Sequence, residues 1–577
     1  MPRALPQGSF LNFRVGGSLF LPAVIPVFFI AIPSVFSVVA VVALPPVAVL
    51  LAVDLVQYNA KEPGTAALKL AHRVSDLPLV RGAAFHHQNV GVAPGATMSN
   101  SKKNVVTFPP RCARMPCKKH LEGIPMEKQP AARQITEGVI WKQILVFFFP
   151  ILLGTFFQQM YNTVDTIIVG RFVSTQALAA VGTTGPLVNM INGFFTGLSS
   201  GATVILAQFY GAENRDGVRR AMHTGITLSL ILGVTITVLG CGFGPTVLEW
   251  MKTPAECIGD ASLYVRIYFA GAVASMLYNM EAGILRAMGD SRRPVLSLIA
   301  ACLVNIVMDI VLVVGLRMGV AGAALATVFS QIVSAAMLLV ILLREKEDPL
   351  RLKELGIDGR LLGRILLIGV PAGLQMVMFD LSNTLIQSGV NSFGSVVMAA
   401  WTAYTKTDAL TWMVSGAFGV AITTFVGQNY GAHKFGRVRQ SVRVCLAMSI
   451  GTVGLISLVL VVLRRFIMGI YTEDAQVIET GAYIIGIIEP FAAAFMPVEI
   501  FAGTMRGMGD SVKPTAIVCL SVCVVRVLWL ATVVRRYHVL LMLCVCYPMT
   551  WVLASVVFLA VYLGYFRKKY LLEATPA

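Results

Sequence analysis

The 577 residues are 56% hydrophobic and only 13% charged, whereas a typical soluble domain is about half apolar and a quarter charged. So little charge cannot cover the water-facing surface of a chain this long, which excludes a soluble globular protein. The net charge of +17 would suit a nucleic-acid-binding protein, but the positions of the basic residues argue against that class.

The first segment, residues 1–138, differs from the rest of the chain. Its apolar run Leu19–Val56 is interrupted by prolines and is followed by a mixed polar stretch without helical periodicity. The run is either an extra membrane segment or signal-anchor, or the assigned start lies too far upstream and Met126 begins the protein. We expect the second interpretation, with an unstructured or mis-assigned extension of no function. The pair Cys112 and Cys117 lacks a second ligand pair, so no metal site is expected there.

From residue 139 the sequence reads as twelve apolar segments, each long enough to cross a bilayer at about 20 residues per span. All are predicted to be helices, so the expected fold is an all-α integral membrane protein. We expect a first lobe over 139–343, a cytoplasmic linker over 344–360, a second lobe over 361–566 and a cytoplasmic tail over 567–577. The expected helices are 139–163, 176–204, 217–242, 259–286, 295–316, 320–343, 361–385, 396–424, 440–468, 478–505, 514–534 and 538–563.

The basic residues concentrate in every second connection between these helices. One set of connections, with the C-terminal tail, holds 21 Lys and Arg residues, and the intervening connections hold seven. Basic residues accumulate on the cytoplasmic side of membrane proteins. The asymmetry therefore predicts a multi-pass protein of the cell (cytoplasmic or inner) membrane, with both ends of the core in the cytoplasm. The charge has a topological role, and no nucleic-acid partner is expected.

The second half of the chain repeats the first. AQFYGAENRDGVRR at 207–220 matches GQNYGAHKFGRVRQ at 427–440, and LRAMGDSRRP at 285–294 matches MRGMGDSVKP at 505–514, both pairs with the same separation along the chain. Pro150 and Pro371 have nearly that separation too. Because each half has an even number of spans, both halves start on the same side of the membrane. The repeat is therefore parallel, as in many secondary transporters built around a central cavity.

At these motifs the sequence resembles the multidrug and toxic compound extrusion (MATE) family, in its bacterial DinF-like, Firmicutes-type branch. The resemblance rests on QQMYNTVDTIIVGRF at 158–172, NIVMDIVLV at 305–313, the two Q-x-Y-G-A segments and the two R-x-M-G-D-S loops. It covers about 139–566. It implies a two-lobed, twelve-helix exporter that couples efflux of amphipathic or cationic small molecules to inward movement of Na⁺ or H⁺, with no other cofactor.

Acidic groups within membrane helices are costly and are functional candidates by default. Asp165 lies near the outer end of the first helix, and Asn305 and Asp309, spaced i, i+4, share one face of the fifth helix. Thr327 lies on the sixth helix among small residues that permit close helix packing. These four positions match the cation or proton site of the family's first lobe, so the resemblance implies that they bind the coupling ion.

The chemistry of these four residues suits two ions. Two carboxylates, an amide and a hydroxyl offer the oxygen ligands that Na⁺ prefers. Two carboxylates close together in a low dielectric also cannot both ionise cheaply, so one could hold an exchangeable proton. The alternative is that the four groups only join helices by hydrogen bonds. The equivalent positions in the second half, near Ile386, Val525, Trp529 and Tyr547, lack these groups, which favours a functional interpretation.

The second half carries other intramembrane charges. Asp380 on the seventh helix aligns with a glutamate that the NorM-like branch uses for cation and substrate binding, but it also suits an ordinary buried hydrogen-bonding role. Lys406 and Asp408 on the eighth helix either face the cavity or neutralise each other. Further intramembrane candidates are Glu281, Glu489, Glu499 and Arg526.

Pro150 removes one backbone hydrogen bond and is expected to kink the first helix. If that bend changes with the protonation of Asp165, it would link ion binding to cavity shape. The two G-D-S turns are expected to be structural, with a glycine at the reversal, an aspartate or serine cap and a proline in the next helix.

Two other classes of function compete with an exporter. A lipid-linked-sugar flippase of the same superfamily would want a cationic cavity, and an ion channel would not need a duplicated plan with acids in one lobe. Enzymatic activity is not expected. The absence of a G-x-x-x-x-G-K-[ST] motif argues against a nucleotide partner, and the expected partners are small-molecule substrates and the lipid bilayer. A monomer is expected.

Overall fold

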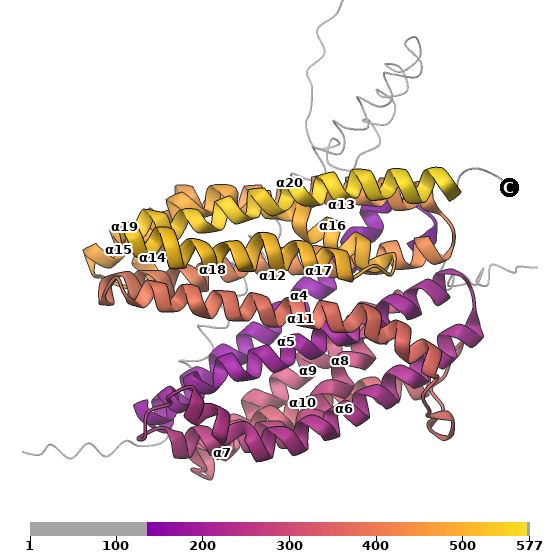
Figure 1. Cartoon of the computed structure of the whole chain (residues 1–577). Helices are drawn as coiled ribbons and strands as arrows, with labels where there is room; N and C mark the ends of the chain where they lie inside the picture. The colour runs from indigo at the N-terminus through magenta and orange to yellow at the C-terminus, as the bar shows by residue number, and fades with distance from the viewer. Residues whose placement is uncertain (1–134, 574–577) are drawn as a thin grey trace, which may run out of the picture. The chain divides into compact units, whose positions relative to one another are not determined.

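The computed structural model describes residues 135–573. The expectations for the apolar run Leu19–Val56, for Met126 and for the pair Cys112 and Cys117 lie outside the described residues. Within the described range every regular element is helical, as predicted (Figure 1).

The helices of the first half are joined by short turns and alternate in direction, except that α7 continues into α8. They are α4 Ile140–Phe172, α5 Thr175–Gly211, α6 Arg215–Trp250, α7 Ile258–Ala270, α8 Ala272–Ala287, α9 Arg292–Asp309 with the π-helical η1 Ile310–Gly315, and α10 Gly319–Leu343. A linker with one short 3₁₀ turn, η2 Leu352–Glu354, leads to the second half.

The second half contains more breaks within its spans. Its elements are α11 Gly359–Asn391, α12 Ser395–Gly431, α13 Phe435–Val462, α14 Arg464–Tyr471, α15 Ala475–Ile488, η3 Glu489–Phe495, α16 Met496–Gly507, α17 Val512–Val518, η4 Cys519–Val524, α18 Val525–Trp529, η5 Leu530–Val534, α19 Arg535–Tyr537 and α20 Leu540–Glu573. Several helices are longer than predicted, because the chain stays helical beyond the apolar core.

Eleven helical stretches of the described chain are long and apolar enough to cross a membrane. The pair α7 and α8, bent by 48°, makes a twelfth if it is one span. This agrees with the predicted twelve. The sequence predicted one continuous fourth helix over 259–286, and the bend at Gly271 is a feature that hydropathy does not report. The tenth and eleventh spans are likewise interrupted, by η3 and by the π-helical η4 and η5.

Side-chain caps fix where the helices begin. Ser174 accepts a hydrogen bond from the Ala177 amide at 3.0 Å to start α5, and Asn214 accepts one from Gly217 at 2.9 Å to start α6. The two G-D-S turns are structural, as predicted: Gly289 and Gly509 have φ values of +92° and +93°. In the first of these turns, Asp290 accepts from the Arg292 amide at 2.9 Å.

The helices of the two halves form two layers, with α5 and α11 side by side where the layers meet (Figure 1). These two helices approach closely through Gly197 and Gly201 on α5 and Gly369 and Gly373 on α11. Across the same boundary, α4 packs on α12, with the rings of Phe148 and Phe418 stacked at 4.2 Å. The segment before α4 also contacts the second half, where the Arg437 guanidinium donates to the Gly138 carbonyl at 2.8 Å.

The two ends of the helical domain are named here by their position relative to the linker. The linker end holds the turns that follow α5, α8, α12 and α16, and the opposite end holds the turns that follow α4, α11 and α13. The linker docks on the first half: Arg219 Nε donates to Glu354 at 2.6 Å, and Arg293 pairs with Glu345 at 2.5 Å. These contacts attach the connection between the halves to the first of them.

Candidate functional site

The first group of predicted site residues lies where α4 packs against α9. Asp309 is the last residue of α9 and has no exposed surface, and Asp165 on α4 is also buried. The two carboxyls are close enough to interact electrostatically. Asn305, one turn before Asp309, is fully buried as well. We call Asp165, Asn305 and Asp309 the first-half acid group.

The polar atoms of the first-half acid group are largely without partners among the described residues. Oδ1 of Asp165, both carboxyl oxygens of Asp309 and both amide atoms of Asn305 are buried and accept or donate no hydrogen bond there. Buried polar groups are nearly always paired, because an unpaired one costs its full desolvation energy. Together, the unpaired oxygens of this group form a set of ligand atoms that fits a small cation or protons.

Thr327 is buried on α10, a helix that packs against α9. Its hydroxyl donates to the Ala323 carbonyl at 3.2 Å, within its own helix. Directly after Asp309 the helix becomes the π-helical η1, and the second half has a π-helical segment, η5, at the position that the internal repeat aligns with it. Such π-helical segments are frequent at functional sites.

Tyrosines near the acids were not assigned to the coupling site from the sequence. Tyr264 on α7 lies within electrostatic range of both Asp165 and Asp309, and it stacks on Tyr268 with ring centroids 6.2 Å apart. Tyr268 in turn accepts a hydrogen bond from Asn192 Nδ2 at 2.7 Å. The i, i+4 spacing of the two tyrosines was a signal that they share a face, but nothing in the sequence showed that this face meets the acids.

Asp380 lies on α11, where that helix crosses α5, and not on the helices that carry the first-half acid group. It is half-buried, and its Oδ2 faces Gly193 of α5. Pro150 lies inside α4, which continues as one helix from Ile140 to Phe172. The linkage of a kink there to Asp165 stays a prediction.

Lys406 and Asp408 do not occupy one environment. Lys406 is exposed, whereas Asp408 is buried. Asp408 Oδ2 accepts hydrogen bonds from Trp412 Nε1 at 2.8 Å and from the Tyr404 hydroxyl at 3.3 Å. Lys406 and Asp408 form no ion pair with each other in the described part of the chain. The interpretation that they neutralise each other is therefore not supported.

The groups beside Asp408 are instead Glu489 and Arg526, which the sequence indicated only as isolated candidates. Glu489 is buried within electrostatic range of Asp408, as is Arg526. The Arg526 guanidinium donates to Thr550 and to Asn383, each at 3.3 Å, and lies 4.2 Å from the Tyr547 ring centroid. Cations are attracted to the faces of aromatic rings. We call Asp408, Glu489 and Arg526 the second-half cluster.

The two Q-x-Y-G-A repeats meet at the linker end, where the ends of α5 and α12 cross. Gln208 Nε2 donates to the Gly507 carbonyl of the second half at 3.0 Å, and Gln428 Nε2 donates to the Ala287 carbonyl of the first half at 2.6 Å. A Cβ at Gly211 would overlap the Gln428 backbone, and one at Gly431 would overlap the Gln208 backbone. We call Gln208, Gly211, Gln428 and Gly431 the linker-end crossing.

The family model for MatE matches residues 150–311 and matches again at residues 371–532, so it covers both halves. This chain belongs to the MatE family. The probable multidrug resistance protein YoeA of Bacillus subtilis is 30% identical over 387 residues, covering 66% of this chain and 83% of that protein. The probable multidrug resistance protein NorM of Thermotoga maritima is 26% identical over 418 residues, covering 70% and 86%.

A solved structure, the outward-facing conformation of a multidrug resistance MATE family transporter, has the same fold. Its TM-score is 0.71 at 23% identity, covering 77% of this chain and all of that one. The predicted resemblance to the family is therefore confirmed. The chain is a multi-pass membrane transporter of small molecules of the multidrug efflux class and is not an enzyme.

Proposed function

We propose that this MatE transporter is a secondary active exporter of amphipathic and cationic small molecules, driven by inward flow of Na⁺ or H⁺. The observation that carries the proposal is the first-half acid group: two buried carboxyls that interact with each other and have unpaired oxygens. Intramembrane acids of this kind mark ion pathways. No nucleotide is needed, and one chain is expected to suffice.

Binding of the coupling ion would remove the charge that makes the empty site costly. Two carboxylates that face each other in a low dielectric repel, and either a Na⁺ or a shared proton relieves that repulsion. The Asn305 amide oxygen is positioned one turn from Asp309 and would complete an oxygen set for Na⁺. Thr327, whose hydroxyl donates within α10, would add a further oxygen from the facing helix.

Export would proceed by rearrangement of the two halves about the linker-end crossing. The basic bias of the connections at that end supports placing it in the cytoplasm. With Gln208 and Gln428 bonded to opposite halves, the crossing holds the linker end shut. Opening towards the cytoplasm must break both hydrogen bonds. A transport cycle therefore has to link two events, the release of the ion and the separation of the helices at the linker-end crossing.

The second half is proposed to contribute to substrate binding rather than to hold a second complete ion site. Asp380, half-buried where α11 meets α5, offers a carboxylate to a cationic substrate. In the second-half cluster, the positive charge of Arg526 already offsets one of the two acids.

The decisive experiment is transport by purified protein in liposomes, with a Na⁺ gradient and a proton gradient imposed separately. Wild type is expected to export ethidium under one of the two gradients, and Asp309→Asn is expected to lose that response. Asp260→Asn, which removes an exposed acid at the opposite end, is the matched control and should transport normally. Export by Asp309→Asn at the wild-type rate, or wild-type export that responds to neither gradient, would contradict the proposal.

A further inference from the structure

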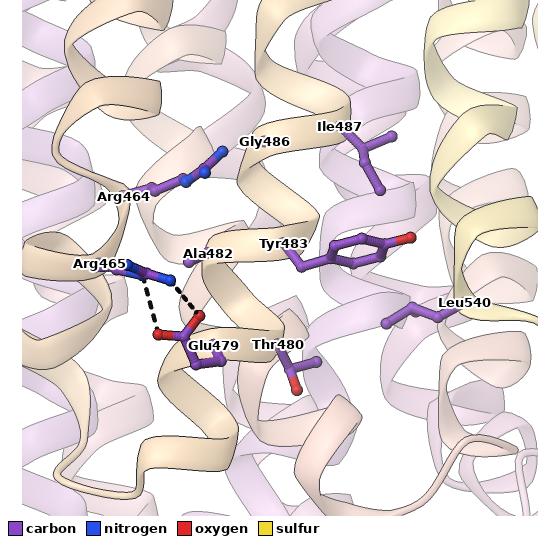
Figure 2. Close-up of a pocket in the computed structure, with 9 residues that line it drawn as sticks. All are labelled: Arg464, Arg465, Glu479, Thr480, Ala482, Tyr483, Gly486, Ile487 and Leu540. Atoms are coloured by element: carbon purple, nitrogen blue, oxygen red, sulfur yellow. Dashed lines mark hydrogen bonds and ion pairs between the residues drawn. The ribbon is translucent and has the colours of Figure 1, made fainter.

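A groove opens at the end opposite the linker, between α14, α15 and the start of α20. Its volume is about 560 Å³. One part of its lining is polar and includes Arg464, Arg465 and Glu479, and another part consists of Ile487, Leu540 and the ring of Tyr483 (Figure 2). We call this the α14 groove. It lies outside both the first-half acid group and the second-half cluster.

The two arginines of the α14 groove differ in their pairing. Arg465 forms an ion pair with Glu479, with Nε and Oε1 3.0 Å apart. Arg464 has no carboxylate partner among the described residues, and its guanidinium lies against Gly486, where a Cβ would overlap Nη1 (Figure 2). The absence of a side chain at position 486 therefore gives the guanidinium its place. The groove carries one uncompensated positive charge in a defined position.

The surroundings of Arg464 place it at the boundary between lipid and water. Phe466 and Ile470 on α14 are 69% and 68% exposed, and their i, i+4 spacing puts them on one apolar face of that helix. A short helix with an exposed apolar face and basic residues beside it is typical of a membrane interface. Tyr483, which lines the same groove, is an exposed tyrosine of the kind enriched at that depth.

The depth of the two arginines also differs. Arg465 pairs at Glu479, near the start of α15, whereas Arg464 lies beside Gly486, about 10 Å further along the helix. The unpaired charge is therefore the one nearer the hydrocarbon, at the level of Gly486 and Ile487 along α15. An unpaired cation at that level suits the phosphate of a lipid, whose chains would continue along the apolar lining.

The first half does not share this arrangement. The internal repeat aligns Gly244 with Arg464, Pro245 with Arg465 and Arg266 with Gly486. There α6 runs without a break to Trp250. The α14 groove is thus not part of the duplicated plan of the fold, and its arginines run against the basic bias of the connections.

We propose that the α14 groove binds a phospholipid with an anionic head group. The Arg464 guanidinium holds the phosphate, and an acyl chain lies along Ile487 and Leu540. A guanidinium suits this role because its planar set of donors matches two phosphate oxygens at once. The proposal concerns the leaflet opposite the linker and does not depend on which ion drives transport.

The test is native mass spectrometry of the purified full-length chain with phosphatidylglycerol or phosphatidylcholine of the same chain length. Wild type is expected to retain phosphatidylglycerol in preference, and Arg464→Gln is expected to lower that retention roughly fivefold, as for the loss of one basic contact at a lipid surface. Gly486→Leu should lower it as well, because the guanidinium is displaced. Added inorganic phosphate should not compete, since it cannot fill the apolar part.

Two further variants separate this site from general charge effects. Arg171→Gln removes an exposed basic residue at the same end, on the last turn of α4, and should retain the lipid as wild type does. Arg464→Lys keeps the charge and should lose less than Arg464→Gln. Equal retention of the two lipids by wild type, or unchanged retention of phosphatidylglycerol by a folded Arg464→Gln, would overturn the proposal.

Discussion

The first-half acid group and the second-half cluster both bury two carboxyls, but their surroundings differ. In the first half, Asp165 and Asp309 face tyrosines and an amide, with no basic residue among the groups described around them. In the second half, Arg526 lies within electrostatic range of Asp408, and Trp412 and Tyr404 donate hydrogen bonds to that carboxylate. The comparison shows how one duplicated fold creates two electrostatic environments.

The difference bears on what each half can do. A carboxyl that is already compensated by a fixed arginine and by indole and phenol donors gains less from a mobile cation than one without such partners. The first half is therefore the better place for an exchangeable ion. The second half is better suited to hold a fixed, internally balanced group of charges.

The largest effect is expected from neutralising the first-half acid group. Asp165→Asn and Asp309→Asn should each lower gradient-driven export by roughly 5–150-fold, the usual size of a coupling between two ligands. Because the two carboxyls act as a unit, the double variant should be no worse than the poorer single one. Liposome export assays measure this. If Asp408→Asn reduced export more than either variant, the assignment of roles to the two halves would be reversed.

Next in size is the loss of the buried cation in the second half. Arg526→Gln should lower the stability of the folded protein by about 3 kcal/mol, because Asp408 is left buried without its counter-charge. Thermal unfolding in detergent measures the change. Adding Asp408→Asn should recover part of the loss, and a double variant that is destabilised by the plain sum of the two single effects would show that Arg526 does not balance Asp408.

At the linker-end crossing the two halves are expected to behave alike. Gly211→Ala and Gly431→Ala should each destabilise the closed state by about 1–3 kcal/mol, because the added Cβ overlaps the facing backbone. Labelling of cysteines by a reagent added on the linker side should increase in both variants. Gly416→Ala is the control on α12, since a Cβ there meets nothing within 4 Å. A strong effect at only one of the two crossing glycines would show that the repeat is asymmetric there too.

The smallest effect concerns the linker, which contacts the first half through exposed ion pairs. Hydrogen bonds from Arg219 hold the pKa of Glu354 below its ordinary value. The stabilisation that ionised Glu354 gives to the docked linker is therefore fully present above the ordinary glutamate pKa. It is lost as the pH falls through the lowered pKa. A spin label at Leu352→Cys should become more mobile over that acidic range. Glu354→Gln should remove the pH dependence, and an unchanged titration in that variant would assign it to another group.

Much of the fold could be predicted because hydropathy and repetition are properties of the sequence alone. Twelve apolar segments, the basic bias of alternate connections and the internal repeat were sufficient for a two-lobed membrane protein. The i, i+4 spacing of Asn305 and Asp309 predicted that both lie on one helix face, and both are fully buried. The bend at Gly271 and the 3₁₀ segment η3 could not be predicted, because a break inside an apolar helix leaves the mean hydropathy unchanged.

The candidate sites show the same limit. Asp408, Glu489 and Arg526 were each visible as intramembrane charges, but their association was not, since they lie on α12, η3 and α18. Neutralisation of Asp408 by its neighbour Lys406 was one of two open interpretations of the sequence, and the structure leaves Lys406 exposed. Closeness along one helix is a poor guide when residues two apart point to different faces.

By itself the sequence determined the class of protein, the number of spans, the duplicated plan and the acids that belong inside the membrane, because the cost of placing polar groups in hydrocarbon is imposed on each segment separately. Only the tertiary structure decided which charges face each other. It brought Asp165 to Asp309 and Tyr264, set Arg526 beside Asp408, and joined the two Q-x-Y-G-A repeats at their glycines. Those contacts depend on the packing of helices from distant parts of the chain, and electrostatic energy depends on that distance rather than on separation in sequence.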